Sequence, residues 1–195
     1  MRHLILLLLF LPVSANAQVL KMNNCLSANW SNNGSKKIFK YNPSIGLEYL
    51  ESRYFLLSST IGISHKCQEY PIYDGEARLQ SNIKYIELST TGRFKLDLNT
   101  VNFYIGIGPT IDWKTKSEYT AHGKLDENSR SRGDFIARKN VINVLSEIGA
   151  YKDFNRLRLE LFASYKTNLT NVIPESRIGF IGHSLSLNLS FGYKL

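Results

Sequence analysis

The best candidate for nucleophilic chemistry in this sequence is the stretch Gly182-His183-Ser184. A serine nucleophile needs a base within hydrogen-bond reach, and an acid must orient that base. If the stretch is a strand, His183 and Ser184 point to opposite faces, because successive strand side chains alternate. The other histidines of the mature chain are His65, near a rim, and His122, in a long connection; neither has a serine and an acid at a fitting spacing. We therefore predict no catalytic residues and no enzyme.

Metal and cofactor sites are not indicated by the sequence either. Its histidines and cysteines do not cluster at the spacing of metal ligands, so we predict no metal and no cofactor. Cys25 and Cys67 fall on the first and the third of the strands proposed below, which do not adjoin. A disulfide between them is not expected from this layout, but the question stays open because Cys67 lies at a strand end.

Two features concern binding. Arg132-Gly133-Asp134, in the longest connection, matches an adhesion tripeptide, but three residues recur often by chance. The formal net charge of +8 fits either a solvated basic surface or attraction to anionic lipid head groups or polyanions at the cell surface. No combination of basic and aromatic residues indicates nucleic-acid binding.

The first residues indicate export. A basic start, Arg2-His3, precedes the apolar run from Leu4 to Leu11, and Ala15-Asn16-Ala17 follows, which is the layout of a signal peptide with its cleavage site. We predict that residues 1–17 are removed and that residues 18–195 form one exported domain without a lipid anchor. No later segment offers about 18 consecutive apolar residues, so any membrane spans are not helices.

The mature chain alternates between apolar and polar residues, which is the period of a β-strand. In the stretch from Lys84 to Leu98, one parity is mainly apolar and the other carries charged and hydroxyl side chains. Pro43 is a warning inside another segment, since proline gives no donor to a strand ladder. The pattern predicts eight strands, at residues 19–31, 38–50, 54–66, 84–98, 101–114, 141–154, 156–166 and 184–195.

The connections between these segments alternate in length. Short ones lie at residues 51–53, 97–100 and 153–155, and long ones lie at 31–37, 67–82, 115–138 and 168–182. In an up-and-down meander, odd and even connections lie at opposite ends of the sheet. We therefore expect the tight turns and both chain termini at one end, and the long loops at the other.

Alternation alone fits both a soluble barrel with an apolar interior and a transmembrane barrel with an apolar exterior. The polar parity combines small residues with both signs of charge, which suits the crowded interior of an eight-stranded barrel. These charged residues are Glu48, Glu87, Arg93, Lys95, Arg158 and Glu160. The apolar parity ends in aromatic residues suited to membrane girdles, namely Tyr49, Trp113, Trp30 and Tyr193. We predict an all-β fold, an eight-stranded antiparallel up-and-down transmembrane β-barrel.

The chain ends in SLSLNLSFGYKL, residues 184–195, without a turn signal or a polar tail. In hydrocarbon an unpaired backbone group costs several kcal/mol, so a sheet in a membrane must have no edge. We therefore expect this last segment to pair with residues 19–31 and close the barrel. Its end is also expected to be the signal read by the barrel assembly machinery.

Two stretches, YIGIGPTIDWKTKSEY at 104–119 and LRLELFASYKTNLTNV at 157–172, carry a family resemblance. Together with the signal peptide and the closing strand, they make residues 18–195 resemble the porin-like outer-membrane β-barrel domain family of the PorT-related type. The resemblance implies an eight-stranded barrel in the bacterial outer membrane, and it supplies no catalytic residues. One departure is that many outer-membrane barrels end in Phe or Trp, whereas this chain ends in Leu195.

The sequence thus predicts a non-enzymatic outer-membrane barrel with a structural, surface-interaction or narrow-permeation role. Its expected partners are the lipid bilayer, lipopolysaccharide and the assembly machinery, with no nucleic acid, and we expect a monomer. Two alternatives stay open, a lipid-modifying barrel enzyme and a soluble lipocalin-like binding protein.

Overall fold

The described part of the chain is built of β-strands. The computed structural model describes residues 17–31, 38–72, 77–98, 100–123, 132–133, 138–170 and 182–195. Its strands are β1 (Ala17–Ser31), β2 (Ile38–Tyr41), β3 (Ser44–Tyr49), β4 (Phe55–Ile72), β5 (Ala77–Asp97), β6 (Asn102–Gly123), β7 (Arg132–Gly133), β8 (Asn140–Phe154), β9 (Leu157–Asn168) and β10 (Gly182–Lys194). Within these ranges no helix is long and apolar enough to cross a membrane.

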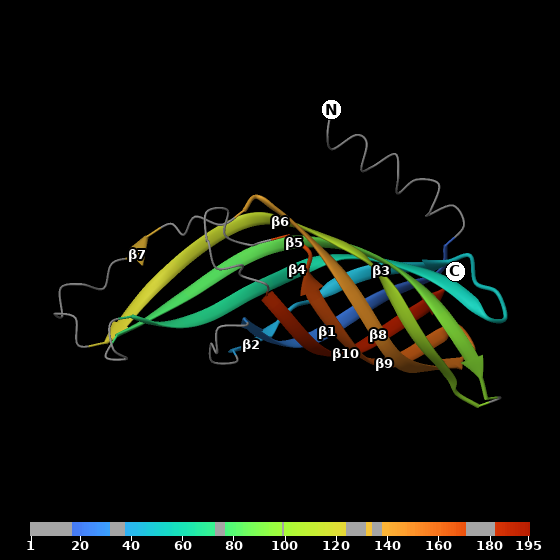
Figure 1. The fold of residues 1–195 in the computed structure, drawn as a ribbon. Helices are drawn as coiled ribbons and strands as arrows, with labels where there is room; N and C mark the ends of the chain where they lie inside the picture. Colours follow the sequence, from blue (N-terminus) through green and yellow to red (C-terminus); the bar gives the residue numbers. More distant parts are fainter. Residues whose placement is uncertain are drawn as a thin grey trace.

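The strands form one closed antiparallel ring (Figure 1). Eight strand positions make up the ring: β1, β3, β4, β5, β6, β8, β9 and β10, with β2 continuing the position of β3 along β1. The short β7 pairs with the far end of β6 and lies off this path. Tight turns join β3 to β4, β5 to β6 and β8 to β9 at one end, as predicted (Figure 1).

The last strand closes the ring against the first. Pairing of β10 with β1 runs from Val19 opposite Lys194 to Ser31 opposite Gly182. Beyond the strands, the amide of Leu195 donates to the carbonyl of Gln18 at 3.0 Å. The predicted pairing of the C-terminal segment with residues 19–31 is therefore confirmed, and it explains why the apolar alternation runs to the end of the chain.

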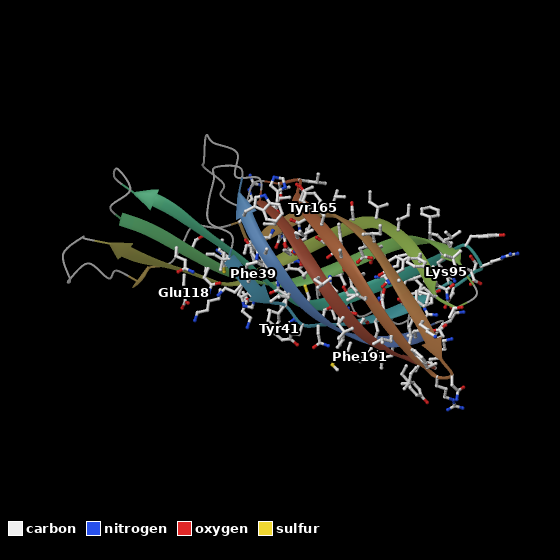
Figure 2. All side chains as sticks on the ribbon, turned by 90° about the horizontal axis from the view of Figure 1, so that it is seen from below. Phe39, Tyr41, Lys95, Glu118, Tyr165 and Phe191 are labelled. Carbon is white, nitrogen blue, oxygen red and sulfur yellow. The ribbon has the colours of Figure 1, made fainter. Side chains whose placement is uncertain are left out.

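Side chains alternate between a polar interior and an apolar exterior. In β9, Leu159 and Leu161 are 41% and 54% exposed, whereas Arg158 and Glu160 are 3% and 1% exposed. Figure 2 shows Tyr41 and Phe191 on the outside of the barrel, where both are exposed. A soluble carrier would bury its apolar side chains inside, so that alternative is wrong and the predicted transmembrane β-barrel is confirmed.

One expected member of the aromatic girdle differs. Tyr49 has the outward parity but is buried, and its hydroxyl lies 3.0 Å from the hydroxyl of Ser59. Trp30 and Trp113 are half-buried and Tyr193 is exposed, as a girdle requires. Tyr49 therefore packs on the barrel wall rather than at an open membrane interface.

The predicted strand at residues 38–50 is split at Asn42-Pro43, as the proline suggested. The carbonyl of Pro43 still accepts from the amide of Ile63 at 3.0 Å, and the side-chain oxygen of Asn42 accepts from the amide of His65 at 3.1 Å. On the far side of this break, β2 pairs with β1 but forms no backbone ladder with β4 among the described residues. The Asn42 side chain thus accepts from the His65 amide of β4 at the point where the backbone ladder ends.

Two segments predicted as long loops contain strand. Ile72 pairs with Ala77, and Ala77 pairs with Gly123, so β4, β5 and β6 extend beyond the other strands (Figure 1). The loop prediction was wrong for residues 67–72, 77–82 and 115–123, because a hairpin that extends beyond the bilayer needs no apolar alternation. His122 consequently lies in β6 rather than in a loop. Most of the predicted loops 31–37 and 168–182 lies outside the described residues.

Deleting residues 186–195 should abolish barrel assembly, because it removes the partner of most of β1 and leaves those backbone groups unpaired in hydrocarbon. The measurement is gel mobility with and without heating, since a folded barrel and its unfolded chain migrate differently. Deleting Leu195 alone is the control, because this 70% exposed residue follows β10. Heat-modifiable mobility in the longer deletion would show that β10 is not needed for closure.

Candidate functional site

Two buried glutamates form the centre of a charge cluster in the tight-turn half of the interior. The Lys21 ammonium lies 2.9 Å from Glu48 Oε1 and 3.1 Å from Glu160 Oε2. Arg93 Nη1 bridges the same two carboxylates at 3.0 Å and 2.7 Å. Arg158 Nη1 donates to Glu48 at 2.6 Å. Strands β1, β3, β5 and β9 are thus joined across the lumen by side chains that leave little room between them.

Further ion pairs carry this tight-turn cluster to the mouth of the barrel. They are Arg93 with Glu147 at 2.8 Å, Arg158 with Asp153 at 2.8 Å, Lys95 with Glu51 at 2.7 Å, and Lys194 with Asp153 at 2.6 Å. Aromatic rings cover the two guanidinium groups, with Arg93 centred 4.4 Å from the ring of Tyr104 and Arg158 centred 3.9 Å from that of Tyr151. The Tyr104 hydroxyl also donates to Glu160.

A second, loop-side cluster lies in the other half of the interior. The Lys66 ammonium is 2.8 Å from Asp112 Oδ2, and that of Lys166 is 3.8 Å from the same oxygen. Lys166 also forms an ion pair with Glu87. Lys66 also donates to Asn168 Oδ1 at 3.0 Å, so protein groups take the place of water around this ammonium group.

Both clusters are balanced in charge. The tight-turn cluster holds five basic groups (Lys21, Arg93, Lys95, Arg158, Lys194) and five carboxylates (Glu48, Glu51, Glu147, Asp153, Glu160), and the loop-side cluster holds two of each. An uncompensated buried charge costs several kcal/mol, so this balance is what permits so polar an interior. The net charge of +8 must therefore be carried outside these clusters.

A small polar cavity lies between the clusters. Its volume is about 70 Å³, and its wall includes Cys25, Glu87, Ser164, Lys166 and Asn188. The buried Oδ1 of Asn23, also in the wall, has no protein partner. By volume and polarity the cavity suits roughly five water molecules, which would satisfy such groups. It is too small for an organic substrate of ordinary size.

His183 and Ser184 lie on opposite faces, as predicted. Ser184 is buried in the interior, whereas His183 stacks on the exterior with its ring centroid 5.9 Å from those of Trp30 and Tyr165. The Tyr165 hydroxyl lies 2.7 Å from His183 Nδ1. The histidine is thus part of an aromatic cluster at the closing seam, and it does not pair with the neighbouring serine.

The other residues considered for chemistry are separated. His65 Nδ1 lies 2.9 Å from Asn42 Oδ1 on the wall, and Cys25 and Cys67 are free thiols. The Cys67 thiol donates to Asn82 Oδ1 at 3.0 Å. In the adhesion-like tripeptide, Arg132-Gly133 pairs with β6 as β7, while Asp134 lies outside the described residues. No three His, Cys, Asp or Glu side chains in the described ranges are grouped to hold a metal ion.

A scan against protein-family models found no match, and a search of curated proteins found none. Among solved structures, Neisserial surface protein A (NspA) is similar, with 10% identity, a TM-score of 0.56, and coverage of 91% of this chain and 96% of NspA. Two further structures are less similar. Ail of Yersinia pestis has 8% identity and a TM-score of 0.48, with coverage of 91% of this chain and 99% of Ail. The N-terminal β-barrel domain of Pseudomonas aeruginosa OprF has 14% identity and a TM-score of 0.43, with coverage of 91% of this chain and 99% of that domain. At such identities the likeness to NspA shows the fold alone.

Strand parity placed Glu48, Glu87, Arg93, Arg158 and Glu160 inside, and the structure confirms each of them. Sequence reasoning did not single out several partners, namely Lys21, Lys66, Asp112, Glu147 and Lys166. Parity was the available signal for these as well, because each continues the polar face of its strand. Which cation meets which carboxylate depends on the stagger of the strands around the ring, and alternation does not encode it.

Replacing Glu160 by glutamine should lower the free energy of unfolding by about 3–5 kcal/mol, because it leaves Lys21 and Arg93 with one carboxylate fewer in a buried site. Urea unfolding of the protein in vesicles, followed by tryptophan fluorescence, measures the change. The control is Glu118→Gln, in which a 26% exposed carboxylate that pairs with Lys116 is lost at a cost below about 1 kcal/mol. Equal losses in both variants would contradict a structural role for the interior network.

Proposed function

We propose that this chain is a non-enzymatic protein of the bacterial outer membrane, exported by residues 1–17 and serving structure and surface interaction. The observation that carries the proposal is a closed barrel with an apolar exterior and a lumen occupied by balanced ion pairs. Arg and Lys side chains facing lipid cost roughly 2–4 kcal/mol each at the bilayer midplane, so an exterior of apolar side chains suits contact with lipid. The ion pairs that fill the lumen leave space there for nothing larger than water.

Several observations support a structural or surface role over catalysis or transport. Arg93 and Lys21 bridge carboxylates from different strands across the lumen, so permeation is at most narrow. His183 and Ser184 face apart, which disfavours a lipid-modifying enzyme. The fold is shared with NspA, whose name describes a surface protein.

The finer identity rests on the sequence motifs. The stretches at 104–119 and 157–172 support the PorT-related type, and the pairing of β10 with β1, which closes the ring within one chain, supports a monomer. The expected partners are the bilayer with lipopolysaccharide, and the assembly machinery acting on β10. The extended sheet of β4, β5 and β6 supplies the surface for interaction, since it reaches farthest beyond the ring (Figure 1).

Protease cleavage on intact cells tests location and orientation together. A recognition site inserted between Ile72 and Ala77, where β4 and β5 end, should be cut by protease added outside the cells. The matched site, inserted at Asn155-Arg156 in the turn between β8 and β9, should be cut only after the outer membrane is permeabilised. Cleavage of both sites, or of neither, on intact cells would contradict the proposal.

A further inference from the structure

A row of basic side chains lies on the outside of β4, β5 and β6, just beyond the apolar band. The outward residues Ile63, Ile86 and Trp113 pair in one row across the three strands. In the next outward row His65 pairs with Lys84, and Lys84 pairs with Lys116. Since a strand rises about 3.4 Å per residue, this row is about 7 Å along the strands from Trp113. Tryptophan marks the membrane interface, so the lysines lie at the depth of lipid head groups.

A β-bulge creates this arrangement. Asp112 and Ser117 both face inward, although they are an odd number of positions apart, five, because the register shifts between Lys84 and Tyr85. The additional residue is Thr115, whose hydroxyl donates to the carbonyl of Lys84 at 3.0 Å. Without the bulge Lys116 would have the inward parity of Asp112. The bulge therefore turns Lys116 outward beside Lys84, in line with the tendency of bulges to re-aim side chains at barrel rims.

This side of the rim is strongly basic. Lys84 and Lys116 are exposed there, and Arg138 and Lys139 are exposed next to them just before β8, where the carbonyl of Lys139 accepts from the amide of Lys114 on β6. The exposed fraction of the Lys116 side chain is 65%. The Glu118 carboxylate lies 2.7 Å from Lys116 on this face, and an ion pair this exposed is weak. The carboxylates of Glu87 and Asp112, on the inner face of β5 and β6, are engaged by interior lysines.

The opposite arc of the loop-side rim has a different character. Over β9, β10, β1 and β2 the outward side chains of this arc are aromatic rather than basic. They are Tyr165, His183, Trp30, Phe39 and Tyr41. Among the described residues, the loop-side rim is therefore basic over β5, β6 and the residues just before β8, and aromatic over β9, β10, β1 and β2.

We propose that Lys84 and Lys116, flanked by Arg138 and Lys139, bind the phosphate groups of a phosphorylated lipid in the loop-side leaflet. Side chains paired across neighbouring strands have Cβ atoms about 5 Å apart, so two ammonium groups can flank one phosphate. Below them, Ile86 is 42% exposed and Ile111 is 36% exposed, which gives the acyl chains of the same lipid an apolar surface. This second contact favours a lipid over a free polyanion. The site rests on the proposed membrane location.

The two tryptophans provide reporters for the basic and the aromatic arcs. In Trp30→Phe the remaining Trp113 reports on the basic arc, and in Trp113→Phe the remaining Trp30 reports on the aromatic arc. Each variant is reconstituted in phosphatidylcholine vesicles that contain one nitroxide-labelled lipid. This lipid is either phosphatidic acid or phosphatidylcholine, and in both the nitroxide is on the acyl chain close to the head group. Quenching gives the relative association of the two labelled lipids at each tryptophan.

At Trp113, phosphatidic acid should associate roughly fivefold or more strongly than phosphatidylcholine, because basic residues attract anionic head groups. At Trp30 the two lipids should associate about equally. Lys84→Glu with Lys116→Glu should remove the preference. The control pair, Arg53→Glu with Lys152→Glu at the tight-turn end, changes the charge equally and should keep it. Heat-modifiable mobility establishes that each variant is folded.

The quenching results distinguish a failure of the phosphate site from a failure of the proposed membrane location. Equal preference at both tryptophans, in a protein quenched by both lipids, would overturn the phosphate site and leave the barrel in the membrane. Absence of quenching by either lipid would contradict the site and the membrane location together. Inorganic phosphate, added at constant ionic strength, should not change the preference; its loss would show a site for free anions rather than for lipid.

Discussion

In hydrocarbon, water cannot satisfy a backbone N–H or C=O group, so every such group in a membrane-spanning strand must find a partner in the protein. The pairing of β10 with β1 meets this requirement at the one place where an up-and-down sheet would otherwise have two edges. Closure at eight strands then fixes the width of the lumen, which is just large enough for side chains to fill. The polar packing, the position of the charges and the small cavity all follow from that width.

The interior network is held by charge balance rather than by strong individual pairs. Removing ions from water costs several kcal/mol each, and their attraction repays this only when the geometry is good and the remaining polar atoms are satisfied. Arg93 illustrates how this is achieved: its guanidinium contacts Glu48, Glu147 and Glu160 and is covered by the ring of Tyr104. Because different strands supply these partners, the network also favours one stagger of the ring over its alternatives.

The sequence predicts the parts of this fold that the bilayer constrains. Alternation identified the strands and the face of Glu48, Arg93 and Glu160, because lipid on one side and a crowded lumen on the other leave little freedom within the span. It failed where that constraint ends: residues 67–72 continue β4 and residues 77–82 belong to β5, although apolar alternation is not required beyond the bilayer. It also missed the bulge at Thr115, because one inserted residue reverses the parity of Lys116 without a local signal in composition.

The barrel faces lipid with its apolar parity and encloses its polar parity. Spin labels on single cysteines along β9, with Cys25 and Cys67 replaced by serine, test this orientation after reconstitution in vesicles. Labels at Leu161 and Ala163 should collide freely with oxygen, which concentrates in lipid, and labels at Phe162 and Ser164 should not. Reversed parity, or equal collision rates at all four positions, would contradict the account.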